Sequence, residues 1–234
     1  MRREETGCGA PARHSRRLLV PVLSGLVVAA LGAGFVVYAL WPRWPAASPA
    51  PDAPHVPIVI AGETFHVPPA AIRIKLQRRS GPQERIDLVY TWPALAPPAS
   101  APNGGAAMAS DRLFITIAPN DGAAEPVERL RTIYLRYAAT EPSFMPDGLA
   151  VVAFRAGTPY QGEDLVYDES APERFVARCS RSTNTLAPAA CLLERFVGHA
   201  NVTVRFPRAW LADWRALASG LDRLVAELRP KPAG

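Results

Sequence analysis

The longest feature of the hydrophobic pattern is an apolar run near the N-terminus. Residues 18–41 form 24 consecutive positions without a charged side chain. At about 1.5 Å per helical residue the run reaches roughly 36 Å, enough to cross a hydrocarbon core of about 30 Å. A helix is expected there, because lipid offers no hydrogen-bond partner to backbone amide and carbonyl groups. The pattern therefore predicts a single transmembrane helix over residues 18–41.

Charges on the two sides of this run predict its orientation. Residues 1–17 contain five arginines and two glutamates, whereas Arg43 is the only charged residue between the run and Asp52. The positive-inside rule then places the N-terminus in the cytoplasm and the C-terminal part in the periplasm, across a bacterial inner membrane. A cleaved signal peptide is the alternative, but its apolar region usually spans about 7–15 residues and ends in small side chains. This run is longer and ends in Leu40 and Trp41.

The composition divides the chain into four segments. Residues 1–17 are the predicted cytoplasmic tail, and residues 18–41 are the transmembrane helix. Residues 42–57 contain six prolines, which favour an extended, semi-rigid linker. Residues 58–234 form the predicted periplasmic domain, which is long enough to bury a hydrophobic core.

Short segments with a period of two residues predict most of this domain to be β-sheet. Apolar and polar side chains alternate over residues 72–77 and again over 86–92, and the sequence RRSGPQ between them favours a turn. We therefore expect these two segments to pair as an antiparallel hairpin. Further strands are predicted at residues 56–61, 63–68, 113–118, 149–154, 164–167, 174–179, 191–197 and 201–206.

Two segments show helical spacing instead. A helix is predicted to open at Pro126, and a second over residues 208–229, where apolar side chains recur every three or four positions. The expected fold class is therefore α+β: an N-terminal transmembrane helix, then a mostly antiparallel sheet with two helices, the last one C-terminal.

The three cysteines fall on both sides of the predicted membrane. Cys8 belongs to the reducing cytoplasmic side, and Cys179 and Cys191 belong to the oxidising periplasmic side. An even number of cysteines outside predicts one disulfide, which would join two successive strands. Two buried free thiols are the alternative.

Charge excludes one class of function. The net charge is +5, but residues 1–17 contribute +3, so the rest of the chain has 21 basic and 19 acidic residues. Such a small excess predicts no nucleic-acid partner. On the predicted hairpin and its turn five basic side chains gather: Arg73, Lys75, Arg78, Arg79 and Arg85. They either protect a solvated edge strand or form a contact surface for an anionic partner.

No motif for catalysis, a cofactor or a metal ion is found. Beyond the apolar run the only histidines are His55, His66 and His199, and no neighbouring nucleophile or ligand set accompanies them. The acidic residues at 163, 164, 168 and 169 have the spacing of a strand with charged ends. The alternative is a periplasmic hydrolase with dispersed carboxylates, in which at least one of four aspartates would face another acid: Asp87, Asp121, Asp164 or Asp168.

Three segments carry a resemblance: FITIAPNDGAAEPVERLRTIYLRY, the two strands that contain Cys179 and Cys191, and VTVRFPRAWLADW. Together they are similar to an uncharacterised family of alphaproteobacterial single-pass membrane-anchored periplasmic proteins. The resemblance implies an inner-membrane protein that faces the periplasm, and it implies no active-site residues. The sequence thus favours a non-catalytic interaction or accessory domain of the cell envelope, with an envelope protein partner or a cell-envelope ligand. The hydrolase and a pure structural spacer are the other two hypotheses.

Overall fold

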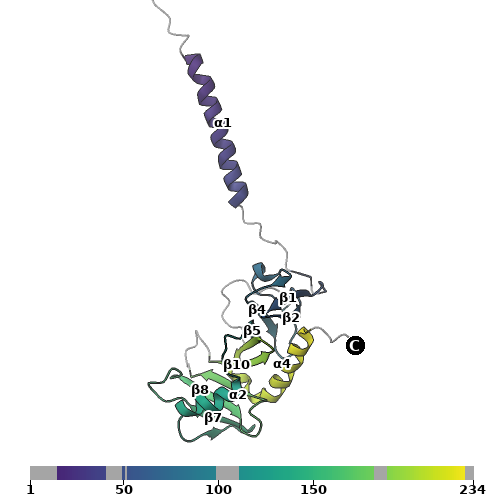
Figure 1. Ribbon diagram of the computed structural model, residues 1–234, viewed down its shortest axis with the longest axis vertical. Coiled ribbons are helices and arrows are strands. Elements are labelled where there is room, and N and C mark those ends of the chain that lie inside the picture. The colour runs from purple at the N-terminus through teal and green to yellow at the C-terminus, as the bar shows by residue number, and fades with distance from the viewer. Residues whose placement is uncertain (1–14, 41–48, 51, 99–110, 182–188, 230–234) are drawn as a thin grey trace, which may run out of the picture. The chain divides into compact units, whose positions relative to one another are not determined.

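The computed structural model describes residues 15–40, 49–50, 52–98, 111–181 and 189–229 of the chain (Figure 1). The chain separates into two compact units, residues 1–45 and residues 46–234. The predicted tail up to residue 14, Trp41 and residues 42–48 of the predicted linker lie outside the described residues.

The first unit contains one helix, α1, which covers Ser15–Leu40. Its described side chains, at residues 23–39, are all exposed. Among the residues that the structure describes, no helix is both long enough and apolar enough to cross a membrane.

The second unit is built around a sheet of eight antiparallel strands in the order β4-β5-β11-β10-β9-β8-β7-β6. Successive strands along the chain are neighbours in this sheet except β5 and β6: β6 starts the opposite edge, and the chain returns to β5 through β11. The strands are β4 (Ile86–Thr91), β5 (Arg112–Pro119), β6 (Ser143–Phe144), β7 (Leu149–Ala153), β8 (Glu163–Asp168), β9 (Val176–Ser180), β10 (Ala190–Val197) and β11 (Ala200–Pro207).

A smaller sheet has the order β2-β1-β3. Strands β1 (Val56–Ile60) and β2 (Glu63–Val67) form a hairpin, and β3 (Gly81–Pro82) pairs with β1 in parallel. The turn of the hairpin puts Ala61 at φ 52° and Gly62 at φ 85°. Since this backbone region favours glycine, Gly62 fixes the two-residue turn of the hairpin.

One face of the large sheet and the small sheet share the main core with the C-terminal helix α4 (Trp214–Leu228). The buried side chains of α4 include Trp214, Leu217 and Leu221, at the helical spacing seen in the sequence. The predicted C-terminal helix is thus confirmed, although Arg208–Asp213 in front of α4 form a 3-10 helix, η3.

The opposite face of the large sheet carries a second, smaller core at one end. Three consecutive short elements, α2 (Pro126–Arg129), the π-helical η2 (Leu130–Tyr134) and α3 (Leu135–Tyr137), supply Leu130 and Tyr134 to this core. Figure 1 shows α2 beside β7 and β8. On β8, Leu165 belongs to the second core and Val166 to the main core. Successive strand residues point to opposite faces, so the two cores lie on opposite sides of the sheet.

The predicted hairpin of residues 72–77 and 86–92 is wrong in its first half. Strand β4 is present, but its sheet partner is β5, and Ile72 forms only an isolated bridge to Leu88. Residues 75–77 form a 3-10 turn, η1 (Lys75–Gln77). Ile74 and Leu76 are 38% and 77% exposed, so the alternating apolar side chains share no buried face. Alternation alone specifies a strand only where one face is covered.

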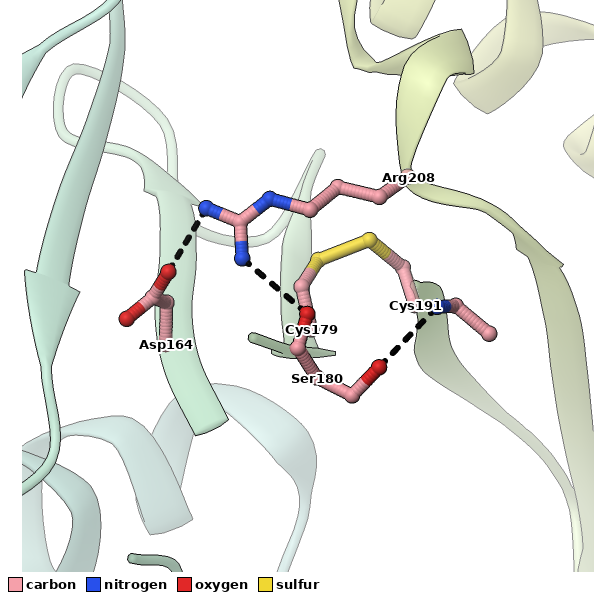
Figure 2. The surroundings of a disulfide bond; sticks show 6 residues. Asp164, Cys179, Ser180, Cys191 and Arg208 are labelled. Carbon is pink, nitrogen blue, oxygen red and sulfur yellow. Dashed lines mark hydrogen bonds and ion pairs between the residues drawn. A yellow bond between two sulfur atoms is a disulfide. The ribbon is translucent and has the colours of Figure 1, made fainter. Parts of the chain in front are cut away.

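The predicted disulfide is confirmed. Cys179 and Cys191 face each other on β9 and β10, and both are buried (Figure 2). In the described chain β9 and β10 pair over three positions, whereas β10 and β11 pair over eight. The disulfide therefore reinforces the short pairing of β9 with β10, which joins the two halves of the large sheet.

A second link crosses the same junction. The Arg208 guanidinium lies 2.6 Å from the Asp164 carboxylate of β8 and donates to the Ser180 carbonyl of β9 (Figure 2). The Ala190 amide of β10 donates to the Ser180 hydroxyl at 3.1 Å. The start of η3 is thus tied to both β8 and β9.

Candidate functional site

Among the residues that the structure describes, α-helices cover the second face of the large sheet at one of its ends. We call the part over β7, β8 and β9 the covered end, because α2, η2 and α3 pack there. We call the part over β4, β5 and β11 the open end, because none of the described α-helices packs on it and the 3-10 turn η1 reaches it through Gln77 at Asp87. The open end is therefore where this face can meet another molecule.

Strand register places polar side chains side by side at the open end. Asp87 of β4 is paired with Thr116 of β5, and Thr116 is paired with Thr203 of β11. In the next row Phe114 is paired with Arg205. Paired residues of neighbouring strands point to the same side of a sheet, so these five side chains form one surface.

A groove with a volume of about 510 Å³ lies on this surface. Three arginines and one aspartate supply its charged lining, which leaves a net charge of +2. The lining residues are Arg73, Arg85, Asp87, Leu88, Phe114, Ile115, Thr116, Thr203 and Arg205.

Asp87 is buried, and its carboxylate is hydrogen-bonded to three neighbouring side chains. Its carboxylate accepts hydrogen bonds from Arg85 at 2.6 Å, from Thr116 at 3.0 Å and from Gln77 at 3.1 Å. Burial opposes ionisation of the carboxyl group, but the hydrogen bonds from Arg85, Gln77 and Thr116 outweigh it and lower the pKa of Asp87. Asp87 thus stays charged and neutralises Arg85.

Arg73 and Arg205 differ from Arg85. Both side chains are exposed, and neither forms an ion pair with any described residue. The Arg73 guanidinium lies over the Phe114 ring, 5.6 Å from its centre. The groove therefore offers two guanidinium groups to an outside anion, beside an aromatic ring.

The structure separates the five basic residues that the sequence grouped together. Arg73 and Arg85 line the groove, and Arg79 and Arg85 line a second hollow of about 670 Å³ beside η1. Lys75 is exposed on η1. Arg78 turns inward, where it donates to the Ile72 carbonyl at 3.0 Å and so holds the backbone of this loop.

The second hollow adds an apolar side chain to this region. Leu76 is the most exposed large apolar side chain outside α1 in the described chain, at 77%. Together with Val59 and Pro82 it lines the hollow, next to Arg79 and Arg85. An exposed leucine among arginines is typical of a protein contact surface.

Arg205 and Thr203 were missed as site residues by sequence reasoning. The signal was present, because Asn201, Thr203 and Arg205 alternate with the buried Val202 and Val204. That pattern indicates a polar face of β11, but only the pairing of β11 with β5 brings Arg205 next to the loop that contains Arg73.

The buried aspartates considered for a hydrolase face bases or a hydroxyl group. Asp164 faces Arg208 and Arg181, while Glu163 pairs with Arg178. Asp168 accepts a hydrogen bond from the Ser170 hydroxyl at 2.6 Å and lies 3.8 Å from Arg174. Asp121 is exposed. Within the described ranges, no group of three histidine, cysteine or acidic side chains could hold a metal ion.

Comparisons with known proteins show the fold. No protein-family model and no curated protein matches the chain. A similar solved structure is Smlt3025, described as an immunity protein of the Stenotrophomonas maltophilia type IV secretion system. It has a TM-score of 0.54 and 18% identity, over 76% of this chain and 94% of that chain.

A second solved structure is the Neisseria meningitidis iron-regulated outer membrane lipoprotein FrpD, with a TM-score of 0.41 and 8% identity, over 76% of this chain and 92% of that chain. At these identities the first likeness concerns the fold alone, and the second carries no argument. The observed α+β architecture, mostly antiparallel with a C-terminal helix, agrees with the fold class expected for the domain.

Proposed function

We propose that this chain is a non-catalytic interaction domain of the bacterial cell envelope that binds a protein partner through the open end of its large sheet. The observation that carries the proposal is the groove in which Arg73 and Arg205 are exposed without an ion pair among the described residues. An arginine that only keeps a surface soluble needs no second arginine and no aromatic ring beside it. Here the two cations share one groove with the ring of Phe114.

The composition of this region supports a protein as the partner. Arginine and aromatic side chains dominate the energetics of protein interfaces, and lysine is depleted there. The groove holds three arginines and Phe114 and no lysine. The immunity protein with a similar fold gives a precedent for a secretion-system role, which we extend to this chain as part of the proposal.

We further propose that residues 18–41 anchor the chain in the inner membrane, with the C-terminal domain in the periplasm. The uncharged run supports this, as do the five arginines that precede it. In α1 the side chains of Leu26 and Phe35 are 62% and 70% exposed, which suits a lipid environment. Membership of the alphaproteobacterial family remains a prediction of the same kind.

The cysteines allow a direct test of this topology. Cys179 and Cys191 form the disulfide, so Cys8 is the remaining thiol. A membrane-impermeant maleimide should label Cys8 in inside-out vesicles and leave it unlabelled in intact spheroplasts. Labelling in intact spheroplasts would place residue 8 outside the cell and reject the orientation.

The partner-binding proposal is tested by affinity capture of the full chain from its own cells. The double variant Arg73→Glu/Arg205→Glu reverses charge at the open end. The matched control, Arg131→Glu/Arg136→Glu, reverses two exposed arginines on the helix of the covered end. We expect a partner that is recovered with the wild type and the control and lost with the first variant. Equal recovery with all three chains would reject the open end as the contact surface.

A further inference from the structure

We propose that the groove takes an acidic segment of the partner protein, in which one carboxylate pairs with Arg73 and Arg205 while a neighbouring aromatic side chain packs beside Phe114. This inference rests on the proposed function, since it names the chemistry of the partner at the same site. Its basis is the charge of the groove, its lining, and the way in which the same sheet face is filled at its other end.

The charge of the groove selects an anion. Arg85 is neutralised by Asp87, to which it donates at 2.6 Å. Arg73 and Arg205 remain, from the loop beside β4 and from β11, and both side chains line the groove. A planar guanidinium group matches a carboxylate in a bidentate arrangement, so two of them can hold one carboxylate from two sides.

The apolar lining argues for a protein segment and against a free anion. Phe114 supplies an aromatic ring to the groove and Arg73 lies over that ring, whereas the side chains of Leu88 and Ile115, which also border the groove, are buried in the main core. A site for inorganic phosphate needs donors and charge but no aromatic wall. A partner segment with an acidic residue next to an aromatic residue would match both the arginines and the aromatic ring of the groove.

The covered end shows what surrounds two arginines on this face where it is covered. Arg178 pairs with the Glu163 carboxylate at 2.8 Å, and its guanidinium lies 4.9 Å from the centre of the Tyr160 ring. Arg129 pairs with the Glu194 carboxylate at 2.7 Å and lies 5.9 Å from the centre of the Tyr134 ring. Both arginines thus have a carboxylate, supplied by a strand of the sheet, and at least one aromatic ring, since Arg178 also lies 5.9 Å from the centre of the Tyr134 ring. At the open end Arg73 has the ring, and a partner would supply the carboxylate.

The probe is a fluorescent octapeptide of alternating glutamate and tyrosine, and its binding to the full-length protein in detergent is followed by fluorescence anisotropy. The matched peptide has glutamine in place of glutamate. We expect the glutamate peptide to bind and the glutamine peptide to bind at least about tenfold more weakly, because hydrogen bonds to a charged group are the stronger ones. Equal binding of the two peptides would overturn the proposal.

Variants test whether the two named arginines form the site. Arg73→Gln and Arg205→Gln should each weaken binding of the glutamate peptide about tenfold. Arg131→Gln, on the covered end, should leave it unchanged. Arg205→Lys should restore only part of the affinity, since lysine cannot make the bidentate contact. If the covered-end variant weakens binding as much as the others, the arginines of the groove are not the site.

Competition decides between a protein segment and other anions. Inorganic phosphate that displaces the peptide at equal concentration would show a general oxyanion site and overturn the proposal. Vesicles of phosphatidylglycerol that bind more tightly than the peptide, through Arg73 and Arg205, would show a lipid site and overturn it as well. If the peptide tests fail but a partner is still captured in cells through the same arginines, only the acidic segment is rejected. Failure of the capture itself would reject the proposed function.

Discussion

The arginines at the two ends of one sheet face differ in their exposure and in their ion pairing. At the covered end Arg129, the last residue of α2, and Glu194 of β10 are each 14% exposed, and their side chains lie 2.7 Å apart. At the open end Arg73 and Arg205 are exposed and have no carboxylate partner among the described residues. The residue type is the same and the sheet is the same.

This difference indicates which arginines serve the fold and which are available for binding. Removing charges from water is costly, so a buried arginine is retained only with its partner. An exposed arginine has no such requirement, and a substitution there usually changes stability by about 0.5 kcal/mol or less. Stability measurements on matched variants can therefore separate the two ends before any partner is known.

The largest expected effect is at the covered end. Arg129→Met should lower the free energy of unfolding by about 3 kcal/mol, because Glu194 would be left without its ion pair. Arg205→Met at the open end is the matched control and should change it by about 0.5 kcal/mol or less. Denaturant unfolding of the full chain in detergent measures both. Equal losses would mean that the open-end arginines are structural too.

The next effect concerns the junction between the two ends. Cys179→Ser should lower the free energy of unfolding by about 2–3 kcal/mol, because the disulfide closes a loop of 12 residues across β9 and β10. Cys8→Ser is the control and should leave the unfolding midpoint unchanged. An identical midpoint for the wild type with and without reductant would show that the disulfide adds nothing to stability.

A smaller effect is expected from the one carboxylate of the groove. Hydrogen bonds lower the pKa of Asp87 in the folded state, so its contribution to stability is present above the unfolded pKa of about 3.9. The contribution is lost as the pH falls through the folded pKa. Asp87→Asn should therefore cost about 1 kcal/mol at neutral pH. The gap between variant and wild type should close in acid, and a gap that does not depend on pH would contradict this account.

The smallest effect is expected at Tyr90 of β4, whose side chain lies in the main core, on the side of the sheet opposite the groove. The Tyr90 hydroxyl is buried and finds no hydrogen-bond partner within the described part of the chain, and burial raises its pKa. Tyr90→Phe should raise the free energy of unfolding by about 0.5–1 kcal/mol, because an unsatisfied hydroxyl is removed. Val89→Ala on the same strand should lower it and serves as the control. A loss of stability in Tyr90→Phe would show that the hydroxyl has a partner after all.

The sequence predicted best those segments in which one face is buried. Alternation over residues 191–197 and 201–206 marked β10 and β11, and the two cysteines marked the pairing of β9 with β10. The same signal failed at residues 72–77, because Gln77 bonds to Asp87 and Arg78 bonds to the Ile72 carbonyl, and these contacts fold the segment into a turn. Such side-chain contacts depend on tertiary structure that alternation does not encode.

The candidate site was predictable in part. Arg73 and Arg85 could be named from the density of basic residues, and both line the groove. Arg205 could not be placed beside them, since that requires knowing that β11 inserts between β5 and β10. A basic patch in sequence therefore indicated the region, while strand order determined which arginines share the groove.

The central claim, that the open end contacts a protein partner, is tested most directly by photo-crosslinking in intact cells. One probe replaces Thr203 in the groove, which keeps Arg73 and Arg205 in place, and a second replaces Lys75 on the exposed turn η1. A control probe replaces Leu135, which is 46% exposed at the covered end. We predict one reproducible protein adduct from the first two positions and none from the third. The same adducts from all three positions, or none from the open end, would contradict the claim.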